Sequence, residues 1–220
     1  APGSVERILE AKARLPNLQI QVAPHTLLMS REEGFRRIGL GAAQVPPLRP
    51  EAEVEAMRVF AEAGRIDIVC SHHAPHRIAD KYSTQPIPGE FTPKVGYSAI
   101  DFFYPLMLTK LGIALGCRMV AEAPAEALGL KRGRIAKGFD ADLIVVKDDP
   151  GPPQAGIHVG GGVPLGLWQV EPLNFQSLGK VTPFTGERLK HRVMKTFLRG
   201  REVYDAEAMT FTRGAVRQIR

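Results

Sequence analysis

The segment that decides how this chain folds is Arg65-Ile66-Asp67-Ile68-Val69-Cys70-Ser71-His72-His73-Ala74-Pro75-His76. Its first half is a short apolar run with the composition of a buried β-strand, and its second half holds three histidines. Each imidazole ring has two nitrogen atoms that need partners, so three rings at this spacing do not fit an apolar core. The segment therefore predicts a polar site at the end of a buried strand. Two interpretations are open: a metal site, or a cluster of histidines bonded to the backbone.

Strands and helices alternate on both sides of this segment. Ser4 is a candidate N-cap of the first helix, Ser30 and Glu33 have the spacing of a capping box, and Pro50 suits the first position of a helix that stops at Gly64. The connections between strands are long enough for parallel pairing, which predicts an α/β fold. The predicted strands are 18–23 and 65–71, and the predicted helices are 5–15, 30–38, 50–64, 97–111 and 117–128, with Pro124 kinking or restarting the last.

The chain becomes richer in β-structure after Gly129. Strands are predicted over 140–146 and 192–204, with a hairpin turn at Gly200-Arg201, and a Gly/Pro-rich insertion spans 151–168. We place a domain boundary near residue 130, which gives an α/β domain over 1–130 and a β-rich satellite domain over 131–220. The glycine triplet inside the insertion is not followed by Lys-Ser/Thr, so it does not predict a phosphate-binding loop.

Composition and charge exclude several classes of protein. Apolar residues make up 44% of the 220 residues, enough for a real core, and no run is long enough to predict a membrane span. The net charge of +6 comes mostly from residues 187–220, where nine Lys/Arg face four Asp/Glu without an aromatic platform for bases. Cys70 and Cys117 have no metal-like spacing and suit free thiols in a reducing compartment. We therefore expect a soluble cytoplasmic protein that binds neither nucleic acid nor membrane.

Several motifs together resemble the dihydroorotases of the amidohydrolase superfamily. The family signature after the eighth barrel strand usually reads Asp-His-Ala-Pro-His, and this chain has His72-His73-Ala74-Pro75-His76 there. The resemblance covers nearly the whole chain apart from the insertion, with the motifs in the same order as in the family. The other matching segments are Val22-Ala23-Pro24-His25, Pro46-Pro47-Leu48-Arg49, 133–143, Thr182-Pro183-Phe184 and 193–204.

This resemblance implies the C-terminal part of a TIM-like (α/β)8 amidohydrolase barrel, followed by a small β-sandwich segment. It also implies a zinc-dependent cyclic amidase that interconverts N-carbamoyl-aspartate and dihydroorotate. The chain corresponds only to the C-terminal half of the family, and the other metal ligands of the family lie upstream of it. We therefore expect either a fragment or a partner that supplies the missing N-terminal half, or a second copy, because the strands at 18–23 and 65–71 would otherwise have open edges.

The resemblance also assigns candidate site residues, two of which depart from the family. His72 stands where the family has its catalytic, metal-binding aspartate, and a histidine that ligates metal through one nitrogen normally keeps a proton on the other. Val45 stands at the position of a substrate-binding asparagine and cannot form its hydrogen bonds. His76 aligns with the histidine that binds the substrate carboxylate, His73 with its neighbour, and Gly96 with the loop that closes over the ring.

Three functions follow from the resemblance. The chain is part of an active dihydroorotase, or an inactive homologue with a structural or regulatory role, for example with aspartate transcarbamoylase, or a hydantoinase or allantoinase type of cyclic amidase. The Ala-Pro-His ending at His76 disfavours the third. For His25 we expect a hydrogen-bonded structural role. From His72, Val45 and the absent upstream ligands, we expect the isolated chain to be inactive and to bind zinc weakly or not at all.

Overall fold

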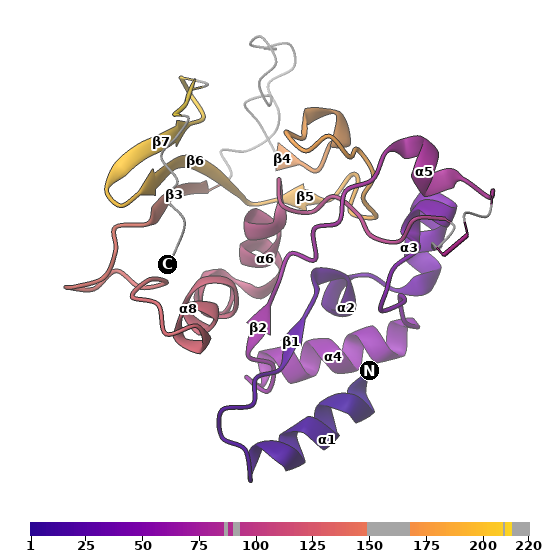
Figure 1. Ribbon diagram of the computed structural model, residues 1–220, viewed down its shortest axis with the longest axis horizontal. Helices are drawn as coiled ribbons and strands as arrows, with labels where there is room; N and C mark the ends of the chain where they lie inside the picture. The colour runs from indigo at the N-terminus through magenta and orange to yellow at the C-terminus, as the bar shows by residue number, and fades with distance from the viewer. Residues whose placement is uncertain (86–87, 90–92, 149–167, 209, 213–220) are drawn as a thin grey trace. The chain divides into compact units, whose positions relative to one another are not determined.

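The computed structural model describes residues 1–85, 88–89, 93–148, 168–208 and 210–212. The chain packs into two compact units, of which the first contains Ala1–Tyr104 and Val170–Glu187. The second contains the described parts of Pro105–Gln169 and Arg188–Arg220 (Figure 1). This division does not follow the expected boundary near residue 130, which stays a prediction. The expected insertion over 151–168 lies outside the described residues except for Trp168.

The first unit is built on a pair of short parallel strands, β1 (Gln21–Val22) and β2 (Ile68–Val69). Gln21 pairs with Ile68 and Val22 with Val69, which confirms the expected parallel pairing but shortens both strands. The pair is held by the Asp67 carboxylate, which accepts from Lys12 Nζ at 2.7 Å and from the Ile20 N–H at 2.6 Å. Within the described residues no closed barrel is present, and β1 and β2 pair only with each other.

Two helix starts in the first unit differ from the expected ones. Pro50 is the N-cap of the fourth helix and not its first residue. Ser4 does not cap the first helix, because the helix already starts at Pro2 with Ala1 as N-cap, and proline fits the first turn. In the fourth helix, Val54, Met57 and Ala61 form the buried face, as their spacing predicts. The helices are α1 (Pro2–Lys12), α2 (Pro24–Leu28), α3 (Arg31–Ile38), the 3-10 turn η1 (Gly39–Ala42), α4 (Glu51–Glu62) and α5 (Ile78–Tyr82).

Only the serine half of the expected capping box is present at the start of α3, because the Glu33 carboxylate bonds to Arg36 and Arg37 and not to the Ser30 N–H. Ser30 is the N-cap, and its hydroxyl accepts from the Glu33 N–H at 3.3 Å. Replacing an N-cap serine with alanine leaves a backbone donor without its partner, so Ser30→Ala is expected to cost about 1 kcal/mol. Ser4→Ala is the matched control, because Ser4 lies inside α1 and caps nothing. Urea unfolding of both variants checks this, and equal losses would contradict the assigned caps.

The core of the first unit contains an aromatic cluster that joins distant parts of the chain. Phe102 stacks on Phe175 with ring centroids 5.5 Å apart and lies 5.8 Å from Phe184. Tyr97 also contacts Phe184, at 5.8 Å, and Tyr97, Phe102 and Phe184 are almost fully buried. Residues 170–187, including the short 3-10 helix η3 (Pro172–Asn174), therefore complete this core from far along the sequence.

The second unit contains a helical segment. Its helices are α6 (Phe103–Leu111), α7 (Ile113–Cys117), the π-helical turn η2 (Arg118–Glu122) and α8 (Ala123–Ala127). The expected helix over 97–111 starts six residues late, because residues 97–100 pair with the histidine segment instead. Pro124 lies in the first turn of α8, directly after the π-helical turn, in agreement with the expected restart.

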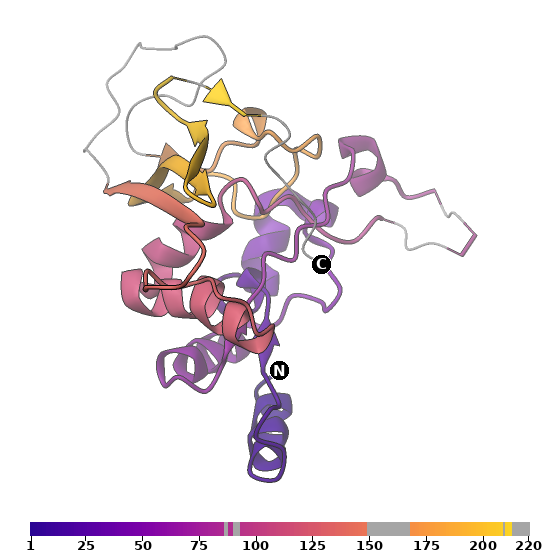
Figure 2. The same ribbon diagram turned by 60° about the vertical axis from the view of Figure 1, so that its left-hand side comes forward.

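A four-stranded antiparallel sheet forms the rest of the second unit. Its order is β3 (Leu143–Asp148), β6 (His191–Leu198), β7 (Arg201–Asp205) and β8 (Thr210–Phe211), while β4 (Trp168–Gln169) pairs with β5 (Arg188–Leu189). The turn between β6 and β7 is Arg199-Gly200, one residue earlier than expected, and both residues have positive φ, as a tight hairpin turn requires. This hairpin is the gold element of Figure 2.

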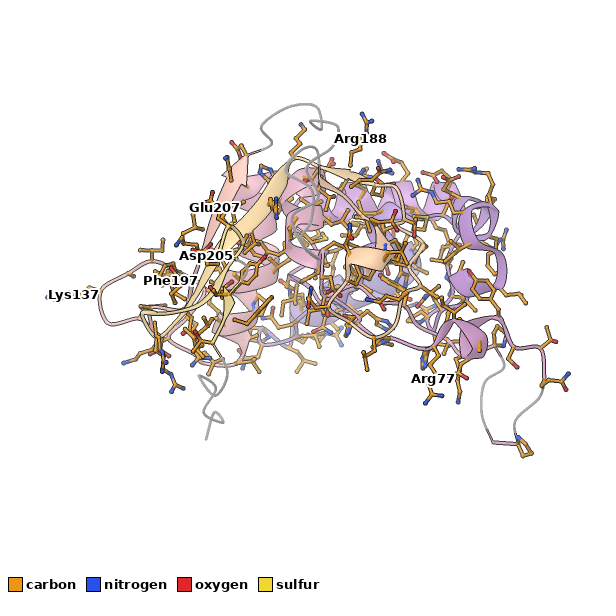
Figure 3. The ribbon with its side chains drawn as sticks, turned by 90° about the horizontal axis from the view of Figure 1, so that it is seen from above. Arg77, Lys137, Arg188, Phe197, Asp205 and Glu207 are labelled. Carbon is orange, nitrogen blue, oxygen red and sulfur yellow. The ribbon has the colours of Figure 1, made fainter. Side chains whose placement is uncertain are left out.

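The β6–β7 hairpin is held by a charged contact across the strands. Lys195 Nζ donates to Asp205 at 2.5 Å and to Glu202 at 2.9 Å. The Asp205 carboxylate also accepts from the Glu207 N–H at 2.8 Å, and both of these residues are labelled in Figure 3. This proximity to Lys195 lowers the pKa of Asp205 to about 2. Part of the basic C-terminal segment is thus neutralised within the sheet. Among the described residues, no helix is both long and apolar enough to cross a membrane.

Candidate functional site

The candidate site lies where β1 and β2 end. Because the two strands are parallel, their carboxyl ends meet at the same edge, which is where barrel enzymes carry their polar residues. Ala23-Pro24-His25 follows β1, and Cys70 to His76 follow β2. The segment 95–100 runs alongside the second of these loops, with His73 and Tyr97 forming a parallel bridge. We call these three segments the strand-exit site.

His25 is a buried, neutral histidine of this site. Only 2% of its surface is exposed, and its Nδ1 lies 3.3 Å from the Tyr97 hydroxyl. Burial, and after it the neighbouring His72, lowers the pKa of His25 to about 4, while the Pro46 carbonyl acts in the opposite direction. Its ring stands edge-on to that of His72, with centroids 5.5 Å apart. The hydrogen bond agrees with the expected structural role.

The lowered pKa of His25 predicts a loss of stability in mild acid. Below the ordinary histidine pKa of about 6.5, the unfolded chain binds a proton that the folded chain does not bind until the pH falls to about 4. The free energy of unfolding should therefore fall by about 2 kcal/mol between pH 7 and pH 4.5, in addition to other acid effects. Urea unfolding at both pH values checks this. His25→Gln should lack this part of the loss, and an equal loss in both proteins would refute the assignment.

His72 has a strained backbone and an unsatisfied ring nitrogen. Its φ is +50°, the left-handed region that few residues other than glycine adopt, and its buried Nδ1 has no hydrogen-bond partner. The ring lines a cavity of about 250 Å³ together with His25, Cys70, Arg49 and further residues of α1 and β1. A strained residue with an unpaired polar atom at a strand end is typical of a functional position.

The described residues do not make a complete metal site around His72. No three side chains of His, Cys, Asp or Glu in the described parts of the chain lie close enough together to hold a metal ion. A catalytic zinc ion needs about three protein ligands, so His72 could be one of them but does not suffice. The described residues alone therefore do not fit the zinc centre that the family resemblance implies.

His73 is used to hold the neighbouring segment. Its Nδ1 accepts from the backbone N–H groups of Ala99 at 3.0 Å and Ile100 at 3.2 Å, and the Ala74 N–H donates to the Tyr97 carbonyl. An imidazole that accepts at Nδ1 carries its proton on Nε2 when it is neutral. A contact of His73 with substrate stays a prediction, and only Nε2 is left for it.

His76 and Gly96 are tied together at the other end of the loop. His76 Nε2 donates to the Val95 carbonyl at 2.9 Å, which leaves Nδ1 of the ring for a further partner. Gly96 has a φ of +114°, and a Cβ there would lie 2.5 Å from the Ala74 side chain. Only glycine allows the two segments to approach this closely. The structure thus brings together His72, His73, His76 and Gly96 around one loop.

Comparison with known proteins agrees with this geometry. No protein-family profile matches the chain. Dihydroorotases from Geobacter sp. (strain M21) and Syntrophus aciditrophicus (strain SB) are 30% and 29% identical to it over 210 residues, or 93% of the chain. The chain is a dihydroorotase homologue. It spans 44% of the length of each of these two relatives.

Solved structures show the same fold for this dihydroorotase homologue. The L-hydantoinase (dihydropyrimidinase) from Arthrobacter aurescens matches 93% of the chain with a TM-score of 0.72 and 24% identity. The D-hydantoinase from Thermus sp. matches 96% of it with a TM-score of 0.75 and 20% identity. The chain covers 43% and 44% of these two structures. At these identities the likeness concerns the amidohydrolase fold alone, and it supports the α/β class expected from the sequence.

The loop before Pro46 differs from what the motif suggested for the dihydroorotase homologue. Val45 is 48% exposed, whereas the preceding Gln44 is only 5% exposed, and neither polar atom of its amide has a hydrogen-bond partner. The buried polar side chain of this loop is therefore Gln44. A substrate contact of Val45 stays a prediction, limited to its apolar side chain.

Two buried polar side chains of the dihydroorotase homologue, Gln44 and Lys81, are not marked by the sequence motifs. Gln44 directly precedes the Pro-Pro-Leu-Arg motif, so its position could have drawn attention to it. Lys81 gave no such indication, because a lysine in a short, mostly polar helix is normally exposed. In the structure it is fully buried on α5.

Proposed function

We propose that this chain forms the C-terminal part of a dihydroorotase-type active site, which interconverts N-carbamoyl-L-aspartate and dihydroorotate in pyrimidine biosynthesis. The observation that carries the proposal is the loop His72-His73-Ala74-Pro75-His76 at the shared exit of two parallel strands, in a chain homologous to dihydroorotases. Opening a cyclic amide requires a water molecule that loses a proton and a leaving nitrogen that gains one. Imidazole groups at a strand exit are suited to hold and move these protons.

The residues of the loop would divide this work. His76, with Nε2 bonded to the Val95 carbonyl, would direct Nδ1 at the substrate, and His73 would fix segment 95–100 beside it. His72 has its Nδ1 free to accept a proton or to ligate a metal, but a single histidine cannot readily do both. Gly96 would let this segment approach the ring of the substrate.

The remaining groups of the site would come from outside this chain. The relatives are more than twice as long as the matched region, and the outer edges of β1 and β2 have no strand partner among the described residues. We propose that an N-terminal part of the same protein, or a second polypeptide or copy, completes the barrel and supplies the zinc ligands. Zinc binding by this chain alone is then weak or absent. A cytoplasmic location is part of the same proposal.

A second candidate function is that of an inactive homologue with a structural or regulatory role, for example in contact with aspartate transcarbamoylase. The residue at position 72, which lies in the loop that identifies the family, favours this second function. His72 replaces the carboxylate expected there, which removes a negative charge beside the metal, and the described residues hold no group of three metal ligands.

A chimera separates the two candidates. The region of the Geobacter dihydroorotase that matches this chain is replaced by this chain, and hydrolysis of dihydroorotate is measured with and without His72→Asp. If the rest of the site is intact, the aspartate should raise turnover at least about 100-fold, the usual size of a general base effect. Lys137→Asp, at an exposed turn of the second unit, is the control and should change nothing.

The isolated chain is the companion experiment. We expect no turnover and less than one zinc ion bound per chain in a titration, because its described residues offer too few ligands. Stoichiometric zinc with turnover would refute this expectation. A chimera that shows no turnover even with aspartate at position 72 would favour the structural role over the enzymatic one.

A further inference from the structure

Lys81 is a buried cation without a counter-ion among the described residues. Its side chain on α5 has no exposed surface, and no carboxylate of the described residues pairs with it. Its Nζ has three N–H donors, and one of them bonds to the Ala43 carbonyl at 3.2 Å. An ammonium group held out of water normally requires a negative partner, because its desolvation is costly. Lys81 thus has capacity for an anion that the structure does not contain.

Gln44 is a second buried group with unused hydrogen-bonding capacity. Its side chain is 5% exposed, and both its amide nitrogen and its amide oxygen lack partners. Buried amides are nearly always bonded, since leaving them unpaired costs on the order of 1 to 3 kcal/mol. One buried amide offers both a donor and an acceptor, which is the pattern needed to bind another amide.

Lys81 bonds to the backbone carbonyl of the residue before Gln44, and this carbonyl also contacts the strand-exit site. The Ala43 carbonyl directly precedes Gln44 in the chain and accepts from both Lys81 Nζ and the Gly96 N–H. Gly96 follows Val95, whose carbonyl accepts from His76. Lys81 and Gly96 thus share the Ala43 carbonyl as acceptor, Gln44 adjoins it in the chain, and Val95 next to Gly96 bonds to His76, which with Gly96 is expected to contact substrate.

We propose that Lys81 and Gln44 form a ligand-recognition subsite of the strand-exit site, in which Lys81 binds a carboxylate and Gln44 binds an amide of the same small molecule. The inference rests on the proposed function, because N-carbamoyl-aspartate and dihydroorotate each carry both groups. It assigns recognition to two residues that the sequence motifs do not mark. Burial lowers the pKa of Lys81 to about 8, so the amine is still mostly charged at pH 7 and can pair with the carboxylate.

Calorimetric titration of the isolated chain tests the subsite with three probes. N-carbamoyl-L-aspartate has carboxylates and an amide, succinate has only carboxylates, and dihydrouracil has only the amides. Lys81→Met should weaken both carboxylate probes at least tenfold and leave dihydrouracil unchanged, whereas Lys81→Arg should retain most of the binding. Gln44→Leu should reduce the advantage of N-carbamoyl-aspartate over succinate about tenfold. The controls Lys190→Met and Gln176→Leu, at exposed positions, should bind as the wild type does.

A measurement on the wild type covers the case in which the buried variants fail to fold. The titration of Lys81 is followed through the NMR shift of its Cε, and saturating N-carbamoyl-aspartate should raise its pKa, since a bound carboxylate stabilises the charged amine. An unchanged pKa, or no binding of any carboxylate probe, would overturn the inference. These readouts do not involve turnover. A chimera without turnover would therefore contradict the proposed function but not the subsite. An active chimera, together with unaltered binding by Lys81→Met, would contradict only the subsite.

Discussion

Gly96→Ala should destabilise the first unit by about 4 kcal/mol, as a sum of backbone strain and overpacking of about 2 kcal/mol each. The φ of +114° is outside the regions that alanine adopts readily. The new Cβ would also lie 2.5 Å from the Ala74 Cβ and 2.9 Å from the Ala74 carbonyl oxygen, and that backbone cannot move without disturbing the Ala74 N–H bond to Tyr97. Urea unfolding measures the loss directly.

Gly64→Ala is the matched control for this substitution. Gly64 also has a positive φ, of +67°, but nothing lies within 4 Å of the position that a Cβ would take. Its replacement should lower the free energy of unfolding by about 1 kcal/mol, the usual cost of placing alanine in the left-handed backbone conformation. If the two variants lost the same stability, the close approach of Gly96 to Ala74 would not be what constrains this position.

Tyr97→Ala should cost about 4 kcal/mol, the usual range for deleting a large buried side chain. Tyr97 has no exposed surface, its ring contacts those of His25 and Phe184, and its hydroxyl bonds to His25. Tyr97→Phe keeps the ring and removes only the hydroxyl, so it should cost about 1 to 2 kcal/mol through the unpaired Nδ1 of His25.

Phe35→Ala provides the comparison, because this aromatic residue of the same unit is 43% exposed. Its loss should stay below about 1 kcal/mol, since little apolar surface returns to water. Urea unfolding followed by circular dichroism ranks the three variants. A small effect of Tyr97→Ala would mean that the strand-exit site is not anchored on the aromatic core.

Local sequence was sufficient for the parts of the fold that depend on neighbours in the chain. The Ser30 cap, the apolar face of α4 and the parallel pairing of two apolar runs were all predictable, because each follows from residues within one element or from the length of a connection. The resemblance to dihydroorotases was likewise carried by short segments such as His72 to His76, and comparison confirmed it.

The parts that could not be predicted depend on contacts between distant residues. Nothing around His73 indicates that its Nδ1 holds residues 99 and 100, and this contact is why the helix expected from residue 97 starts only at Phe103. Gln44 and Val45 are adjacent, and only the folded loop decides which of them is buried. The burial of Lys81 likewise depends on the folded structure and not on its neighbours in the sequence.

The aromatic cluster of the first unit also constrains the order in which the protein can fold as it is synthesised. Phe102 emerges from the ribosome more than 70 residues before its ring partners Phe175 and Phe184. Asp101 likewise emerges more than 70 residues before Gln176 and Ser177, whose N–H groups it accepts from. Until these partners arrive, the apolar faces of the first 104 residues have no cover from residues 170–187. While the residues between 104 and 170 are being synthesised, these faces are thus exposed to chaperones and to aggregation, and the core beside the histidine loop is complete only when residues 170–187 are present.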